Sequence, residues 1–459
     1  MEVTSSFQTL LSEFQCVFTA PSFLIFLDLV SGWVLSHRHR YVTDLIWSSG
    51  STQKGHHSRY HRFFSHAAWK LDGLCCVLAQ LLVRIFAPTG LIVLAVDDTL
   101  CRKRGLTVYG AGMHHNPLIS SRAKPLTSWG HDWVVLTLIV RCPFWAPTKV
   151  WSLPIAFRLY RNRQGLTKGR KKNTEGCKKK ARKPDPNHRT RPELAVELIC
   201  LVASWFPDRK LLVTGDSAYG GQSVLKKLPE NVDLISHVHP KGALYEPAPQ
   251  AVPGKKGGRP RKKGQRLPGM AAWAEDQSQP WTELTFDQFG LHATLLVKTI
   301  QALYYKAGGQ RLLTIVLVRD TVGKRPDQMF YCTCLDWDAR TILSHYSCRW
   351  SIEVTFEHSK QLLGLEDPAN RLPKAVERTA PMALVLYSLI VAWFHREGHK
   401  HVKFPDRPWY TKKAEPSFGD ALTTLRRLSC QDGFRGYLPR TGYLKTQVAR
   451  LIEFVSLAG

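Results

Sequence analysis

Four side chains in the last third of the chain have the types and spacing for chemistry on a phosphodiester. Tyr346 is followed by Arg349, Glu353 and Lys360, so the steps are three, four and seven residues. Because each residue of an α-helix turns by about 100°, these steps return to nearly the same face of one helix. Cations on that face suit a phosphate backbone, and the carboxylate beside them suits a divalent metal.

Two more carboxylates follow apolar runs. Residues 91–96 predict a buried central strand that ends at Asp97, and Asp98 would then face the opposite side. Residues 210–214 predict another strand, which Asp216 closes. A carboxylate at the end of a strand is a common catalytic placement in α/β sheets. The alternative for Asp97 is a turn or a helix cap after the strand.

Together these motifs resemble the DDE-type transposases of bacterial insertion sequences that carry a Tyr-Arg-Glu-Lys signature. The resemblance runs from about residue 14 to residue 451. It implies a triad of catalytic, metal-binding carboxylates: Asp97, Asp216 and Glu353. It also implies three phosphate contacts near the scissile bond: Tyr346, Arg349 and Lys360. Glu357, one turn after Glu353, is a rival ligand that does not fit the signature.

The resemblance implies an enzyme that cleaves DNA at the ends of an insertion sequence and transfers the 3′-OH ends to target DNA. Two Mg²⁺ ions, for which Mn²⁺ can substitute, would be held by the three carboxylates. The expected partners are double-stranded DNA and a second copy of the chain in a synaptic complex. Two alternatives remain open: an inactive or domesticated DNA-binding protein, and a ribonuclease H-like nuclease that cuts without joining ends.

Composition supports a polyanionic partner. Lys plus Arg exceed Asp plus Glu by 64 − 36, which gives a net charge of +28, and the positive charge recurs along the chain. With 44% hydrophobic residues the chain is expected to be globular. Its eleven Cys residues lack zinc-site spacing and predict reduced thiols.

No secretory signal is visible, and no membrane span is expected. Pro21, Asp28 and Gly32 interrupt the apolar stretch 17–35, which therefore predicts a buried helix pair. The stretch 381–394 predicts a core helix. We expect a cytoplasmic protein associated with DNA.

The remaining pattern predicts an α/β protein in which strands precede and follow a helix. Strands are predicted at 134–140, 150–160, 232–238, 283–286, 293–297, 313–318 and 330–335, and helices at 192–206 and 375–393. The resemblance implies a ribonuclease H-like core, which the spacing permits. Four regions follow: a helical N-terminal DNA-binding region at 1–88, the first part of the core at 89–241, a largely β insertion with a basic loop at 242–340, and the catalytic helix with a helical C-terminal region at 341–459.

Three basic segments are candidates for DNA contact. Arg59 and Arg62 lie among aromatic residues, where the alternative is a helix cap with core Phe side chains. Residues 158–191 predict a mobile loop that binds phosphates without sequence preference. Arg259 and Arg261 belong to a basic, Gly-rich stretch at 254–266, which favours nonspecific phosphate contact over a minor-groove hook.

Overall fold

The computed structural model describes residues 2–116, 119–121, 123–162, 188–249, 261–288, 291–323, 325–404, 412–434, 447–452 and 455. Its α-helices are α1 (Ser5–Ser12), α2 (Ala20–Leu35), α3 (Val42–Ser48), α4 (Ser58–Ser65), α5 (Leu71–Phe86), α6 (Arg191–Trp205), α7 (Gln222–Leu225), α8 (Met270–Glu275), α9 (Tyr305–Gly308), α10 (Ala339–Ser347), α11 (Ser351–Leu363), α12 (Pro373–Arg396) and α13 (Phe418–Phe434). Short 3₁₀ helices are η1 (Gln15–Val17), η2 (Ser51–Gln53), η3 (Cys348–Trp350) and η4 (Gly398–His401). The strands are β1 (Ile92–Arg102), β2 (Gly112–His115), β3 (Thr127–Arg141), β4 (Val150–Tyr160), β5 (Leu211–Gly215), β6 (Val232–His237), β7 (Thr282–Gln288), β8 (Leu291–Leu303), β9 (Leu312–Asp320) and β10 (Gln328–Cys332).

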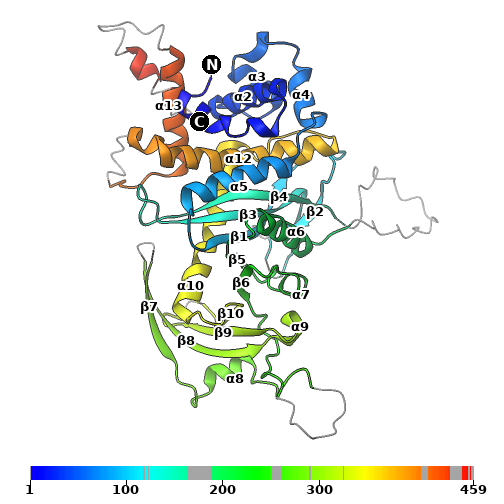
Figure 1. The fold of residues 1–459 in the computed structure, drawn as a ribbon, viewed down its shortest axis with the longest axis vertical. Helices are drawn as coiled ribbons and strands as arrows, with labels where there is room; N and C mark the ends of the chain where they lie inside the picture. Colours follow the sequence, from blue (N-terminus) through cyan, green and yellow to red (C-terminus); the bar gives the residue numbers. More distant parts are fainter. Residues whose placement is uncertain are drawn as a thin grey trace, which may run out of the picture.

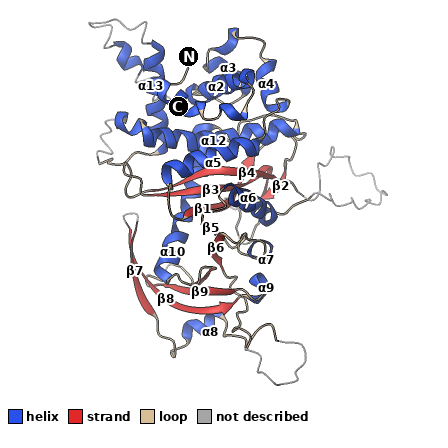
Figure 2. Cartoon of the chain, in the orientation of Figure 1, coloured by secondary structure: helices blue, strands red, loops and turns tan. Residues whose placement is uncertain are grey.

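All ten described strands form one mixed sheet. Their order is β2-β3-β1-β5-β6-β10-β9-β8-β7, with β4 paired to β3. β1, β3 and β4 form an antiparallel series, whereas β5 and β6 run parallel to β1. The strands predicted from apolar runs are confirmed, and so is the α/β class (Figure 2). The central strands read as continuous apolar runs because helices cover the sheet.

The predicted β insertion extends this same sheet. β10 pairs with β6 in antiparallel register, so that Tyr331 lies opposite Ser236, and β9, β8 and β7 follow outward. Figure 1 shows these strands at one end of the molecule and most of the helices at the other. The backbone ladder thus runs without interruption from β4 to β7.

The helices α1–α4, α12 and α13 form a helical layer at the end opposite the insertion (Figure 1). α12 lies at its base and packs against β4, α4, α5 and α11. The predicted helical character of 1–88 and of the C-terminal region is confirmed for the described residues. One hydrophobic core includes side chains of this layer and of the sheet.

The predicted helix pair at 17–35 is wrong, because the structure has one helix there, α2, preceded by the short η1. Pro21 lies in the first turn of α2. Backbone N–H groups in the first turn have no partner within the helix, so proline is well tolerated there. Asp28 is buried, and Lys54 and Tyr60 donate hydrogen bonds of 2.7 and 2.9 Å to its carboxylate. Pro381 likewise stays inside the continuous helix α12.

Among the described residues, α12 is the helix whose length and composition would allow it to cross a membrane. Within the fold, 94% of its most apolar stretch is buried. The predicted core helix accounts for this burial, since a buried helix of a globular protein is apolar on every side.

Gly32 allows α2 and α3 to approach closely. A Cβ atom at this position would lie 2.1 Å from the backbone oxygen of Leu45. Because this neighbour is a backbone atom, a change of side-chain rotamer cannot relieve the clash. We expect Gly32→Ala to lower the free energy of unfolding by about 3 kcal/mol through overpacking. Urea denaturation measures this change. Gly73→Ala in α5 is the matched control, because a Cβ there meets nothing within 4 Å and improved helix propensity should leave stability equal or higher. Equal effects of the two changes would contradict the close approach.

Candidate active site

The sheet brings Asp97 and Asp216 to neighbouring positions. Val96 on β1 pairs with Gly215 on the parallel strand β5, and each Asp is the next residue along its chain. β1 continues to Arg102, so Asp97 lies inside the strand. The predicted strand end at Asp97 is wrong, and so is the alternative of a turn or helix cap there. Pairing with β3 carries the strand past this point. The backbone around Asp216 is fixed by Ser236, whose hydroxyl donates to the Asp216 carbonyl at 2.7 Å.

Asp97 is largely buried and carries a positive partner. Arg349 donates from Nη1 to Asp97 Oδ2 at 2.7 Å, and the backbone N–H of Asp98 donates to Oδ1 at 2.9 Å. Burial raises the pKa of Asp97 to about 7, although Arg349 opposes the rise. The neighbouring carboxylates of Asp216 and Asp98 raise the pKa further. Burial is thus the main cause of the raised pKa, and the carboxylates near Asp97 in the middle of β1 add to it.

The signature residues do not lie on one regular helix, and this part of the prediction is wrong. Tyr346 lies near the end of α10, Arg349 in η3, and Glu353 in the first turn of α11. The backbone stays helical but tightens into a 3₁₀ turn between the two helices, which changes the angular spacing of the side chains. The ring of Tyr346 packs against those of His237 and Phe330, at centroid distances of 5.0 and 4.8 Å.

Arg349 connects most of the signature. Besides Asp97, its guanidinium lies 3.6 Å from Glu353 Oε1 and 5.8 Å from the ring centroid of Tyr346. Glu353 remains 43% exposed, so a ligand in solvent can reach it. Lys360 points elsewhere and donates to the carbonyl of Leu100, farther along β1, at 2.8 Å. Glu357 accepts a hydrogen bond from Gln361, one turn farther along α11.

A second group of charges lies next to Asp97. Sequence reasoning assigned no role to its carboxylates and placed Arg191 in the predicted phosphate-binding loop at 158–191. Asp98 faces away from Asp97, and its Oδ1 accepts a 2.6 Å hydrogen bond from Tyr219. Arg191, at the start of α6, lies 3.4 Å from Asp98 and also bonds the buried Asp132 of β3. Burial raises the pKa of Asp98 to about 6, and Asp132 adds to the rise. The sequence signal for this group was a carboxylate within each of two long strands, Asp98 in β1 and Asp132 in β3.

Tyr219→Phe should destabilise the protein, because Asp98 would lose a buried donor without a replacement. We expect a loss of about 2 kcal/mol in the free energy of unfolding. Tyr331→Phe is the matched control, since its equally buried hydroxyl donates to the neutral carbonyl of Gly220 at 2.9 Å. Denaturation of both variants at neutral pH measures the difference. A smaller loss for Tyr219→Phe than for the control would contradict a charge-assisted bond at Asp98.

The family model described as DDE superfamily endonuclease matches residues 24–303. The chain belongs to this family. The match includes Asp97 and Asp216 and ends before Glu353. No curated protein matches the chain. As a DDE superfamily endonuclease, the protein is a metal-dependent nuclease, in line with the acidic centre on β1 and β5.

The carboxylates of this endonuclease fit a divalent cation by their chemistry. Asp97 and Asp216 supply hard oxygen donors side by side, and Glu353 reaches the same guanidinium as Asp97. Within the described ranges, no three His, Cys, Asp or Glu side chains are already gathered as a metal site. Arg349 supplies the positive charge there instead. Arg349 occupies Oδ2 of Asp97, so a cation that bound this oxygen would displace the guanidinium.

Two of the other predicted DNA contacts lie in the helical layer. Arg59 and Arg62 belong to α4, which packs against α2, α3 and α12 in the helical layer. The Arg59 guanidinium donates to the carbonyl of Lys54, whereas Arg62 is exposed. Arg261 is exposed, and Arg259 lies outside the described residues.

The predicted basic loop at 158–191 is shorter than expected at both ends. Arg158 belongs to β4 and is paired with Asp72 and Glu197, while Arg191 begins α6. These arginines are therefore held by carboxylates of the fold. Residues 163–187 lie outside the described residues.

The half-buried imidazole of His345, the residue before Tyr346, should make the stability of the protein fall in acid. Burial lowers its pKa to about 4, and Arg141 lowers it further, while its ring stacks on that of Trp337 at a centroid distance of 5.0 Å. Between pH 6.5 and 4 the unfolded chain would bind a proton that the folded chain does not, so stability falls as pH falls. His345→Phe keeps the stacking and should reduce the loss of stability between about pH 7 and pH 5 by about 1 kcal/mol, allowing for partial exposure. Denaturation at both pH values measures it, and an unchanged loss would contradict the assignment.

Proposed function

We propose that this endonuclease is a DNA transposase of the insertion-sequence type, which cleaves DNA at element ends and joins the 3′-OH ends to target DNA. The observation that carries the proposal is the Arg349 guanidinium, which contacts both Asp97 and Glu353 beside Asp216. It links the carboxylate of Asp97 on β1 to Arg349 and Glu353 of the signature.

The strand order supports a ribonuclease H-like core. Three antiparallel strands, β1, β3 and β4, precede two strands parallel to β1, and the spatial order is β4-β3-β1-β5-β6. Asp97 lies on the first of these strands, and Asp216 directly follows β5. Rigid strands of this kind hold two carboxylates at fixed separation, which binding of a divalent cation requires.

The chain's own residues have distinct tasks in this proposal. Asp97, Asp216 and Glu353 hold the divalent cations, Mg²⁺ or Mn²⁺. Metals bound there supply an activated oxygen nucleophile and stabilise the leaving 3′ oxygen. Arg349 releases Asp97 and turns to a phosphate, for which its planar guanidinium is suited. Tyr346 and Lys360 contact phosphates on either side. Two DNA ends must be held together for joining, so we infer that a homodimer acts on them.

An assay of DNA cleavage and strand joining distinguishes a transposase from the alternative functions. Linear DNA that carries the native element ends is incubated with the wild-type protein, target DNA and Mg²⁺, and products are resolved on denaturing gels. Joined products support a transposase. Cut but unjoined ends would favour a plain nuclease, and binding without cutting would favour a DNA-binding protein that has lost activity.

A further inference from the structure

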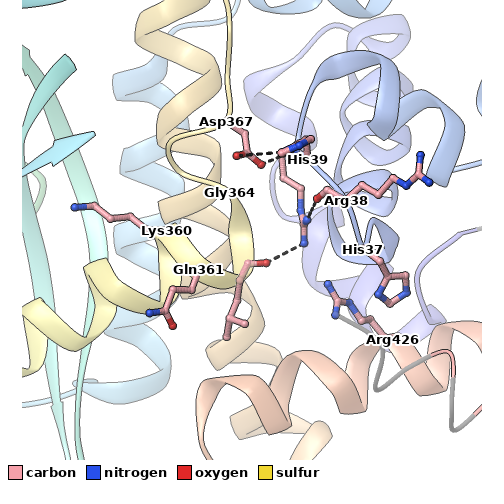
Figure 3. Close-up of a pocket in the computed structure, with 10 residues that line it drawn as sticks. His37, Arg38, His39, Lys360, Gln361, Gly364, Asp367 and Arg426 are labelled. Atoms are coloured by element: carbon pink, nitrogen blue, oxygen red, sulfur yellow. Dashed lines mark hydrogen bonds and ion pairs between the residues drawn. The ribbon is translucent and has the colours of Figure 1, made fainter. Parts of the chain in front are cut away.

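A second positively charged site lies at the far end of α11. A cavity of about 540 Å³ is bordered by the link between α2 and α3, by the end of α11 and by α13. The link contributes the sequence His37-Arg38-His39-Arg40, and α13 contributes Arg426 (Figure 3). Asp367 is the carboxylate among the residues that line the cavity. Positive groups therefore outnumber negative ones along its wall.

Two of these cations are buried, and the guanidinium groups of both donate to backbone carbonyls. Burial lowers the pKa of Arg40, and the carboxylates of Asp367 and Asp44 raise it by less. Arg426 is 4% exposed and donates to the carbonyls of Val34 and Ser36 at 2.8 and 3.1 Å. Arg40 is 6% exposed, and its guanidinium donates to the carbonyls of Arg38 and Leu362. Burial lowers the pKa of Arg426 to about 10, and the charge of Arg40 lowers it further. Two neighbouring buried guanidinium groups are costly unless an anion neutralises them.

Arg40 still has an unused donor. Its Nε is buried and has no hydrogen-bond partner in the part of the chain that the structure describes. The contact with the Leu362 carbonyl caps α11, which accounts for one nitrogen of Arg40. It does not account for Arg426, which lies on a different helix. Asp367 is already engaged, because it accepts from the backbone N–H of Arg40 at 2.8 Å and lies 3.8 Å from His39.

The position of the cavity suggests which anion it binds. Glu353 lies in the first turn of α11, and Gly364, its C-cap, lines the cavity. About eleven residues of helix span about 16 Å, and phosphates along one strand of a duplex advance by about 3.4 Å each. A duplex that runs parallel to α11 with its scissile phosphate at Glu353 would present another phosphate near the cavity, about five nucleotides away.

We propose that the cavity between His37–Arg40, the end of α11 and Arg426 binds a backbone phosphate of the DNA on which the carboxylates act. The inference rests on the proposed function for the identity of its ligand. Lys360 of the signature also lines this cavity, so the proposal extends the signature contacts and gives the link between α2 and α3 a role in holding DNA at a distance from the cut.

Duplex binding without metal tests the proposal. Affinity of wild-type protein and variants for a short duplex of random sequence is measured across a salt series, with a chelator present so that no cleavage occurs. Each phosphate contact contributes about 0.9 to the slope of log K against log salt concentration. Arg38→Gln, an exposed change, should lower the slope by about 1. Arg426→Gln should lower it at least as much, after circular dichroism has shown that the variant is folded.

Arg84→Gln is the matched control, because Arg84 is exposed and paired with Glu13 outside the cavity. Slopes for Arg38→Gln and Arg426→Gln equal to that of the control would overturn the proposal. Inorganic phosphate provides a second probe, since it should raise the melting temperature of the wild type more than that of Arg38→Gln. Protection by phosphate together with unchanged DNA slopes would also overturn it, because the cavity would then bind a free anion. Absence of cleavage or joining with Mg²⁺ bears on the proposed function alone.

Discussion

Replacing Asp97, Asp216 or Glu353 by its isosteric amide should abolish DNA cleavage. Each amide keeps the shape of the side chain but removes a negative oxygen that a divalent cation needs. We expect each variant to lose at least about 10³-fold in cleavage rate, as is typical for a residue that acts as part of a catalytic unit. Because such residues act together, the double variant Asp97→Asn/Asp216→Asn should be hardly slower than either single variant. Single-turnover cleavage of end-containing DNA with Mg²⁺ measures all of these rates.

Glu357→Gln is the control for this series. Glu357 lies one turn after Glu353 on the same helix, and its described hydrogen bond is with Gln361. It should retain cleavage within a few-fold of the wild type. The reverse outcome, with Glu357→Gln inactive and Glu353→Gln active, would move the third ligand by one turn. DNA binding in chelator should remain for every variant, so that loss of cleavage is not loss of binding.

Arg349→Gln should separate metal binding from cleavage. Arg349 donates to Asp97 Oδ2 at 2.7 Å, so a cation that binds this oxygen competes with the guanidinium. Without DNA, Arg349→Gln should bind Mn²⁺ more tightly than the wild type. We expect the affinity to rise about tenfold, which is typical when a group that contacts a metal ligand is changed. Cleavage should nevertheless fall by about 10²–10³-fold, because the phosphate loses a positioned cation. Calorimetric Mn²⁺ titration and single-turnover cleavage give the two values.

Arg349→Lys is the informative companion variant. Lysine keeps the charge but cannot bridge two groups with a planar fork, so it should recover only part of the cleavage rate. If Arg349→Gln bound Mn²⁺ no better than the wild type, the guanidinium would not be a competitor for the metal. If cleavage were unchanged, Arg349 would serve only to neutralise Asp97 in the free protein.

The elements that hold the carboxylates were predictable because each is encoded locally. An apolar run before Asp97 and another before Asp216 predict strands, and parallel pairing then brings the two residues together. The four strands of the insertion, β7 to β10, could also be predicted from the sequence, since each contains a run of residues that favour β-structure. Within each strand, the alternation of side chains determines which face of the sheet a residue takes.

What the sequence did not yield depends on contacts between distant segments. The 3₁₀ turn at 348–350 directly follows Tyr346, whose ring packs against β6 and β10, and the signature spacing encodes neither feature. The network of Asp98, Asp132 and Arg191 draws on two strands and a helix. The contact of Arg426 with Val34 joins residues 392 positions apart. No local pattern predicts such a pair.

The insertion and the nuclease centre are joined in a way that affects how the chain can be shortened or recombined. β10 pairs with the free edge of β6. β6 in turn is the neighbour of β5, the strand that directly precedes Asp216. A chain without residues 242–340 would leave β6 with a bare edge, and bare edges recruit strands from other molecules. The insertion is therefore not a detachable module. Loss or exchange of this region during evolution would leave β6 as an edge strand that needs another protection against pairing with other molecules.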